Sequence, residues 1–243
     1  MQFEPPLIPA TLIRRYKRFL ADVHLDDGTA LTAHCPNTGS MLGCQEPGAR
    51  VWLSRSDRPS RKYPHTWELV ESSPGVLVGI HTGRSNRLVE EALKTGMLAD
   101  RLGGFDRIRR EVTLPGGGSR IDFVLEGPAG EPPCYLEVKN VTAAVEDGVA
   151  LFPDAVSTRG TRHMRHLAEL ASQGARAALV FCVQRDDVAE VRPADAIDPA
   201  YGLALREAIA AGVEVCALGA RVSPRRIALQ RRLPVICPQL DAA

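Results

Sequence analysis

Two stretches, SRIDFVL (119–125) and CYLEVKN (134–140), decide the fold of the second half of this chain. Each is a short run with β-branched and aromatic residues, which favours a strand. The loop between them, EGPAGEPP, is rich in turn residues, so we expect an antiparallel hairpin. Counting outward from the loop places Asp122 within about one residue of Glu137 or Lys139 on the opposite strand.

An acid and a base stand two residues apart on the second of these strands. Glu137 and Lys139 share one face of the strand, because side chains alternate along it. Taken alone, the pair is typical of a solvated sheet face with a weak ion pair. With Asp122 roughly 5 Å away across the hairpin, however, two carboxylates repel unless a positive group lies between them. Carboxylates suit Mg²⁺, so both a solvated face and a metal site stay open.

Composition bounds the class of protein. The chain has 243 residues, 44% of them hydrophobic, which is enough for one large or two modest domains with packed cores. The formal net charge is +1, so an anionic partner must be bound by local patches. Because no apolar run approaches about 18 residues and no signal layout opens the chain, we expect a cytoplasmic protein without membrane contact. The six scattered cysteines favour buried thiols over disulfides.

The first eighty residues carry the pattern of an all-β unit. Short apolar runs lie at 21–25, 30–35, 50–54, 66–71 and 76–80 and are separated by Gly, Pro, Asn and Asp. Asp27-Gly28 predicts a hairpin turn, and a helical turn is indicated only within 12–20. The size suits a small barrel of the oligonucleotide-binding (OB) type, which we assign to residues 1–82.

The pattern changes to mixed α/β over residues 83–243. Residues 86–98 predict a helix that Ser85 or Asn86 caps and Gly96 ends. Strands are then expected at 108–114, 119–125, 134–141, 177–184 and 213–222, with helices at 161–174 and 199–212. This order predicts a two-domain α/β protein whose second domain has a mixed sheet.

The element order and the Asp, Glu-x-Lys arrangement resemble the PD-(D/E)XK nuclease-like fold. In that resemblance Asp122 and Glu137 ligate Mg²⁺ or Mn²⁺, with the Val138 carbonyl as a third ligand. Lys139 would orient the attacking water or stabilise the charge of the phosphate, and the metal would polarise the phosphoryl oxygen. The alternative is a version of the fold that keeps these residues only as a charge cluster.

Further stretches, among them HCPNTGSM, GCQEPG, RKYPHTWELV and FPDAVSTRG, make the chain similar to the sugar fermentation stimulation protein A (SfsA) family almost end to end. The resemblance implies an OB-like N-terminal domain, a nuclease-like C-terminal domain, non-specific DNA binding and a regulatory role in sugar, especially maltose, metabolism. It also favours Glu91 over Glu90 as a further catalytic acid from the core helix, a choice that the helical pattern alone leaves open.

Candidate nucleic-acid contacts are basic residues interleaved with aromatic ones, a composition that suits phosphates and stacked bases. They are Arg14, Arg15, Lys17 and Arg18 around Tyr16 and Phe19, together with Arg61 and Lys62. The alternative is a solvated charged face. Because nine Lys and Arg in residues 1–80 face eight Asp and Glu, no domain-wide field follows, and the fold must gather the basic residues on one side.

Polar residues in loops complete the candidate sites. Asn37 and Ser40, in a turn-rich loop, could contact a phosphate or base, or could serve the turn alone. Arg159 and His163, at the start of a helix, could line the cleft, with capping and surface charge as the alternative. Gln184 ends a strand where nuclease-like folds place a polar substrate contact, or it is simply a strand-end residue.

Three functions therefore stay open. The first is a metal-dependent DNA endonuclease, and the second is a DNA-binding regulator that does not cut. A nucleotide or small-ligand sensor is the third. Other transcription regulators are possible partners, and the oligomeric state is left open.

Overall fold

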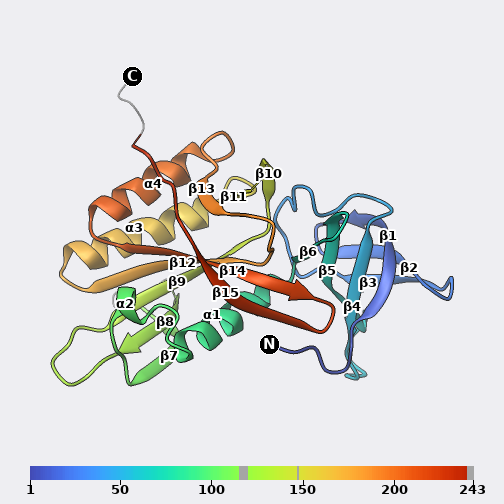
Figure 1. The fold of residues 1–243 in the computed structure, drawn as a ribbon, viewed down its shortest axis with the longest axis horizontal. Helices are drawn as coiled ribbons and strands as arrows, with labels where there is room; N and C mark the ends of the chain where they lie inside the picture. The colour runs from blue at the N-terminus through green and yellow to red at the C-terminus, as the bar shows by residue number, and fades with distance from the viewer. Residues whose placement is uncertain (115–119, 147, 240–243) are drawn as a thin grey trace.

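The computed structural model describes residues 1–114, 120–146 and 148–239 and consists of a β-barrel beside an α/β unit (Figure 1). The barrel strands are β1 (Ile8–Tyr16), β2 (Leu20–Leu25), β3 (Ala30–His34), β4 (Arg50–Arg55), β5 (His65–Ser73) and β6 (Val76–Gly79). They pair in the order β3-β2-β1-β4-β5-β6, and a β3–β5 pairing between His34 and Thr66 closes the barrel. Closure leaves the fully buried Trp67 and its apolar neighbours as a core of their own. The OB-type barrel is confirmed.

The helical turn expected within 12–20 is wrong. Strand β1 runs to Tyr16, and a turn holding Lys17 and Arg18 at φ values of 50° and 64° leads into β2. Pairing of β1 with both β2 and β4 overrides the weak helical signal. Both φ values lie in the left-handed region that glycine usually takes, so this turn holds two basic residues in a strained backbone.

The α/β unit is built on a six-stranded sheet of order β15-β14-β12-β9-β8-β7. Its strands are β7 (Arg107–Thr113), β8 (Arg120–Glu126), β9 (Cys134–Val141), β12 (Arg176–Val183), β14 (Glu214–Ser223) and β15 (Arg226–Leu233). The central strand β12 is parallel to β9 and β14, and the outer pairs are antiparallel, so the predicted mixed sheet is confirmed.

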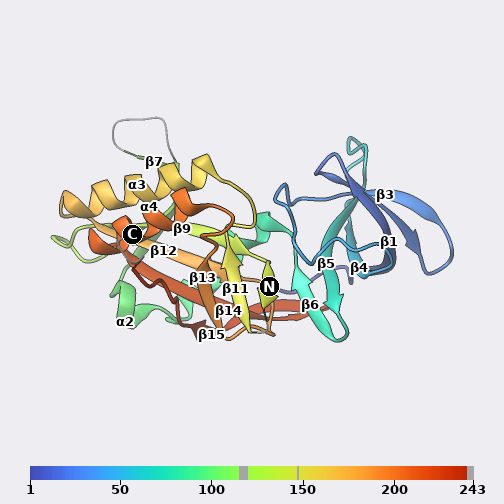
Figure 2. The same cartoon turned by 90° about the horizontal axis from the view of Figure 1, so that it is seen from above.

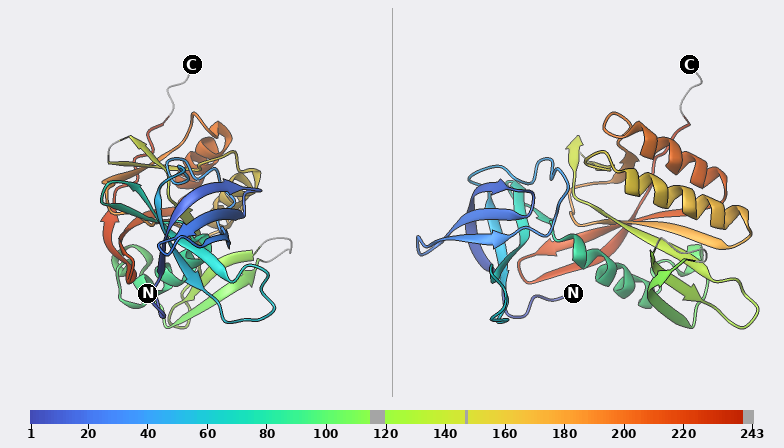
Figure 3. Two further views of the ribbon diagram at one scale, coloured as in Figure 1. Left: turned by 90° about the vertical axis from the view of Figure 1, so that its right-hand side faces the viewer. Right: turned by 180° about the vertical axis from the view of Figure 1, so that it is seen from behind.

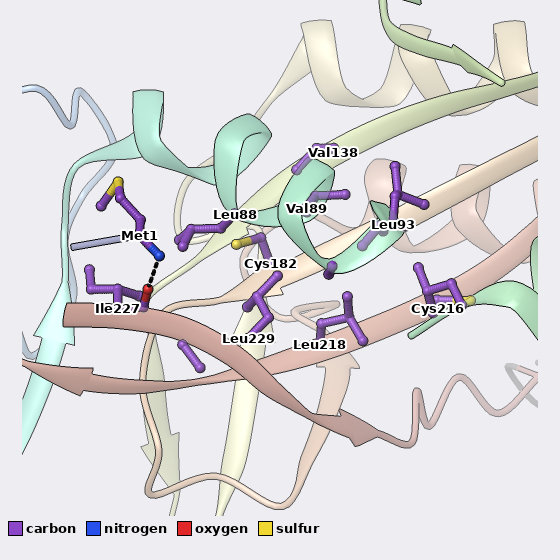
Figure 4. Close-up of a cluster of buried hydrophobic side chains, with 14 of the residues drawn as sticks. Met1, Leu88, Val89, Leu93, Val138, Cys182, Cys216, Leu218, Ile227 and Leu229 are labelled. Carbon is purple, nitrogen blue, oxygen red and sulfur yellow. Dashed lines mark hydrogen bonds between the residues drawn. The ribbon is translucent and has the colours of Figure 1, made fainter. Parts of the chain in front are cut away.

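Helices cover both faces of this sheet (Figure 2). On one face lie α1 (Ser85–Lys94) and the short α2 (Ala99–Leu102), and on the other lie α3 (Thr158–Ser172) and α4 (Pro199–Ala210). Figure 4 shows Leu88, Val89 and Leu93 of α1 against Val138 of β9 and Cys182 of β12. The apolar stripe of α1 therefore fixes that helix over the strand carrying Glu137 and Lys139.

Several elements were not foreseen. A 3₁₀ turn η1 (Thr82–Arg84) leads directly into α1, so Arg84 is the N-cap and neither Ser85 nor Asn86 caps the helix as expected. A separate three-stranded sheet of β10 (Ala144–Glu146), β11 (Val149–Phe152) and β13 (Glu190–Pro193) lies beside the main sheet, and β15 adds an edge strand. Short strands without a clear period leave little signal in the sequence.

The barrel and the α/β unit lie side by side (Figure 3), and hydrogen bonds join them beyond the covalent connection. The N–H of Gly79 on β6 donates to the carbonyl of Gln184 at the end of β12, at 2.8 Å. On the other side, the N–H of Met41 donates to Oδ2 of Asp154 at 2.8 Å, and the Ser40 hydroxyl donates to the Asp154 carbonyl. The units are thus held at both edges of the space between them.

The cysteines form no disulfides in the described part of the chain. All six cysteines are free thiols, and five of them are buried. Within the described ranges, no helix has the length and apolarity needed to cross a bilayer.

Candidate metal centre and adjoining cavities

The hairpin of β8 and β9 brings Asp122 to Glu137 as expected. Phe123 pairs with Leu136, and continuing this register by one residue sets Asp122 opposite Glu137. The ladder ends there, and Oδ2 of Asp122 instead accepts the N–H of Val138 at 2.7 Å. In an extended strand the N–H and C=O of one residue point to the same edge, so the Val138 carbonyl also faces the side of Asp122.

Glu137 is the most enclosed charged group at this centre, with 3% of its surface exposed. Its Oε1 accepts from Nζ of Lys139 at 2.6 Å and from Nδ1 of His163 on α3. Its Oε2 is buried and has no hydrogen-bond partner in the described part of the chain. A buried carboxylate oxygen without a partner is costly, so this atom is open to a further positive group.

His163 was expected to contact nucleic acid, yet it is 7% exposed and lies against Glu137. The Nε–H of Arg159, one turn earlier on α3, faces Nε2 of His163 at 3.4 Å. Because a carboxylate oxygen only accepts, Nδ1 of His163 donates its hydrogen to Oε1 of Glu137. His163 is therefore a support for Glu137.

The pKa values of the two carboxyl groups are shifted in opposite directions. Burial, and next the charge of Glu137, raise the pKa of Asp122, against the hydrogen bonds from Val138 and Asn86. Burial also acts to raise the pKa of Glu137, but the hydrogen bond from His163 and the charge of Lys139 outweigh it, so that pKa is lowered. Without an added cation, the site therefore holds Glu137 ionised and disfavours a second charge on Asp122.

The donor set fits a small, hard divalent cation. It consists of the Asp122 carboxylate, the unpartnered Oε2 of Glu137 and the Val138 carbonyl, all of them oxygens. Mg²⁺ needs only one or two protein carboxylates, because it keeps several waters. Within the described residues, no group of three or more His, Cys, Asp and Glu side chains is placed to hold a metal ion.

Two neighbouring cavities open at these residues. The first, here the Asp122 cavity, has a volume of about 630 Å³ and reaches Asp122, Glu137 and His163. The second, here the junction cavity, has a volume of about 470 Å³ and extends between the units to the loop at Asn37. Their shared lining residues are Thr82, Asn86, Val138, Lys139 and Arg159. The two cavities therefore meet at Lys139.

The acid that α1 contributes to the Asp122 cavity is Glu90, and the structure does not bring Glu91 there. Glu91 points away, because its carboxylate accepts from the amino group of Met1 at 2.7 Å and from Arg87 at 3.2 Å. Glu90 is 6% exposed and pairs with Lys94 at 2.9 Å and with Arg110. Both acids flank the apolar stripe of α1, so only the tertiary packing separates them.

Gln184 is not brought into either cavity. Its side chain is fully buried between the units, and Nε2 donates to Oδ1 of Asn140 at 2.5 Å and to the carbonyl of His81 at 3.3 Å. It therefore supports Asn140, which does line the junction cavity. Sequence reasoning missed Asn140 and Asn86 as lining residues, since polar residues next to a motif carry no pattern of their own.

Of the loop residues predicted to contact nucleic acid, some line the junction cavity and others make hydrogen bonds within the protein. Asn37 lines the junction cavity, while its Oδ1 accepts the N–H of Gly39 at 2.9 Å. Ser40 binds the Asp154 carbonyl, so its hydroxyl serves the contact between the units. Arg15 donates to the carbonyls of Asn37 and Gly39 at 3.0 and 2.8 Å, which holds this loop in place. Ser40 and Arg15 are thus engaged within the protein.

The remaining basic residues are accessible to different degrees. Arg18 is exposed and lines the junction cavity, and Lys17 beside it is exposed. Arg14 pairs with Asp22 at 2.8 Å but keeps 67% of its side chain exposed. Arg61 donates to Thr66 at 3.0 Å, and Lys62 lies over the ring of Tyr63, 5.5 Å from its centroid. The structure therefore brings only Arg18 of this group to the two cavities.

Comparison with known proteins gives consistent matches. Residues 13–80 match the model described as "SfsA N-terminal OB domain", and residues 83–226 match "Sugar fermentation stimulation protein RE domain". A "Sugar fermentation stimulation protein homolog" of Alkalilimnicola ehrlichii is 64% identical over 239 residues, which cover 98% of this chain and 100% of that protein. A homolog of the same name from Thioalkalivibrio sulfidiphilus is 63% identical over 235 residues, covering 97% and 98%.

A solved structure matches along nearly the whole chain as well. It is Pyrococcus furiosus SfsA in complex with Ca²⁺, with a TM-score of 0.85 and 28% sequence identity. The match covers 97% of this chain and 98% of that one. The arrangement of barrel and α/β unit is thus shared with that protein.

Proposed function

This chain belongs to the sugar fermentation stimulation protein (SfsA) family, and from that premise we propose that it is a DNA-binding protein with a site for metal-dependent phosphodiester hydrolysis. The observation that carries the proposal is the unpartnered, buried Oε2 of Glu137 beside Asp122, whose own ionisation that charge disfavours. A divalent cation would satisfy both groups at once. The Pyrococcus furiosus protein was solved in complex with Ca²⁺, which supports a cation in this family.

The roles of the residues follow from their positions. Asp122, Glu137 and the Val138 carbonyl would hold Mg²⁺ or Mn²⁺, which would polarise a phosphoryl oxygen and lower the pKa of a water. Lys139 spends one of its three N–H groups on Glu137 and lines both cavities, so its other N–H groups can orient a water or bind a phosphate oxygen. His163 holds Glu137 in place.

A second function, DNA binding without cutting, is favoured by one observation. Oε1 of Glu137 is engaged by both Lys139 and His163, so the lysine is tied to a proposed metal ligand and is restricted in its approach to a phosphate. The names of the relatives support a role in sugar fermentation, and a regulator of genes in the cytoplasm would serve that role together with other transcription regulators.

Incubation of the purified protein with supercoiled, linear, branched and single-stranded DNA separates the two functions. We expect Mg²⁺ or Mn²⁺ to permit cutting of at least one substrate, and EDTA or Glu137→Gln to abolish it. If the metal binds but none of these DNAs is cut, the protein is a regulator without hydrolytic activity. If neither metal binds at millimolar concentration, the charged residues form only a cluster.

A further inference from the structure

Resting on the proposed function, we infer that the junction cavity binds one nucleotide of a single DNA strand next to the phosphate to be cut. We infer further that the side-chain amide of Asn140 donates to that nucleotide's phosphate. The cavity adjoins the proposed metal centre, since Lys139 and Val138 line both hollows. A strand held at the metal centre would therefore place its neighbouring nucleotide here.

The orientation of Asn140 is fixed by a chain of hydrogen bonds. The carbonyl of His81 can only accept, so the group of Gln184 that faces it, 3.3 Å away, must be the donating Nε2. The same Nε2 lies 2.5 Å from Asn140, which must therefore present its Oδ1. The hydroxyl of Ser85 donates to the same Oδ1 at 2.8 Å.

Asn140 is left with two unused N–H groups on Nδ2. Because Oδ1 is occupied by Gln184 and Ser85, Nδ2 is on the other side of the amide, and Asn140 lines the junction cavity. Within the ranges that the structure describes, Nδ2 has no hydrogen-bond partner. Two fixed, unused donors in a polar cavity suit an acceptor such as a phosphate oxygen.

The charges of the cavity select an anionic ligand. Arg18, Lys139 and Arg159 bring three positive charges to its lining. The one acid in the lining, Asp154, accepts the N–H of Met41 with its Oδ2. Arg18 stands at a φ of 64°, a strained conformation for a residue other than glycine, which is typical of functional positions.

Size and closure favour a single strand over a duplex. A volume of about 470 Å³ is in the range of small-molecule sites, so it suits a single nucleotide rather than a double helix. The contacts of Ser40 and Met41 with Asp154 bridge the units at one side of this space. Val156, whose surface is 72% exposed, adds an apolar lining residue on which a base or sugar can pack.

Asn140→Asp tests the inference with little change of shape. The new carboxylate still accepts from Gln184 and Ser85, but it repels a phosphate where the amide would donate. The matched control is Gln230→Glu, the same change on the exposed part of β15, at a residue that lines neither cavity. Arg18→Gly is a second test, because it removes a positive charge at a φ that glycine accepts readily.

Binding is measured in EDTA by fluorescence anisotropy, with a fluorescein-labelled oligothymidine of about ten nucleotides and a blunt duplex of equal length. We expect Asn140→Asp and Arg18→Gly to weaken binding of the single strand by about tenfold or more, since a hydrogen bond to a charged group is worth that factor. Gln230→Glu should bind as the unmodified protein does. Thermal melting should show that all three variants are folded.

Unchanged binding by both cavity variants, or equal binding of the duplex, would overturn the inference. Because no metal is present and nothing is cut, this result is independent of the proposed hydrolysis. A protein that binds the single strand through Asn140 but fails every cleavage assay would keep this inference and lose the hydrolytic function.

Discussion

Nζ of Lys139 lies 2.6 Å from Oε1 of Glu137, two residues earlier on the same strand. The pair is almost enclosed, with 13% and 4% of the two side chains exposed, so it is not the solvated ion pair of an open sheet face. Salt screens an enclosed ion pair only weakly. Removal of either residue leaves the charge of the other buried without its partner.

Metal binding is expected to raise thermal stability by mass action, by ~2.7 kcal/mol at a hundredfold excess over Kd. Asp122→Asn should abolish this gain. The pKa of Asp122 is higher in the folded chain than in the unfolded one. The free energy of unfolding therefore falls as pH rises from the unfolded pKa to the folded pKa. The metal-free variant should therefore melt about 2–4 °C higher at neutral pH, the shift that ~1 kcal/mol produces.

Glu169→Gln is the control for this prediction, since it removes a carboxylate from the exposed face of α3. Melting curves with and without Mg²⁺ or Mn²⁺ decide the outcome. A full metal-induced shift in Asp122→Asn would show that the cation binds elsewhere.

Lys139→Met should separate metal binding from hydrolysis. Methionine keeps much of the length of the side chain but offers no N–H to a water or phosphate. We expect calorimetry to detect Mg²⁺ or Mn²⁺ binding at least as tight as in the unmodified protein, because the charge that competes for Glu137 is gone. Cutting of DNA should fall by about 10²-fold or more. Cleavage that survives this change would remove Lys139 from the reaction.

His163→Leu should move metal binding to higher pH. The hydrogen bond from His163 helps to keep the pKa of Glu137 low against the effect of burial, so its loss leaves Glu137 protonated over a wider acidic range. His163→Asn can place an N–H near the position of Nδ1, so it should restore much of the unmodified protein's dependence of metal affinity on pH. The measurement is the Mg²⁺ affinity as a function of pH.

The lowered pKa of Glu137 also makes the free energy of unfolding depend on pH. Glu137 contributes stability above its unfolded pKa and loses it as pH falls through the lower, folded value. His163→Leu should cost ~1–3 kcal/mol at neutral pH, the value of a hydrogen bond to a charged group. Identical pH profiles for His163→Leu and the unmodified protein would contradict the supporting role.

Gly39→Ala should weaken the junction between the units. A methyl group there would come within 2.7 Å of both oxygens of Asp154 and would displace that carboxylate from Met41. We expect a loss of ~1–3 kcal/mol, as for other overpacked sites. Gly104→Ala is the control, because a methyl group there meets nothing within 4 Å. Equal melting temperatures for both variants would mean that the loop adjusts without cost.

DNA binding by the barrel should depend steeply on salt. Arg14 and Lys17 are exposed enough to reach phosphates, so we expect log Kobs to fall with log salt by about 0.9 per phosphate contacted. Changing both residues to Ala should make the slope less steep by the equivalent of about two phosphate contacts. Arg15 is left intact, since its removal would free the loop at Asn37. A slope near zero would exclude this surface.

The hairpin of Asp122 and Glu137 could be predicted because its register depends on a short loop and on alternation, which are both local. The choice between Glu90 and Glu91 could not, since both flank the same apolar stripe and only the packing of Met1 and Arg110 separates them. Arg15 shows the same limit, because a charge pattern does not tell whether a guanidinium faces solvent or holds a loop.

The contacts of Ser40 and Met41 with Asp154 have a consequence for exchanging parts between relatives. The two loops hold each other through these hydrogen bonds, so we expect a foreign counterpart to weaken the junction. A chimera that takes residues 1–80 from a distant homolog should assemble poorly unless residues 153–157 come from the same parent. A module for such exchange should therefore include, besides the barrel, this five-residue piece of the α/β unit.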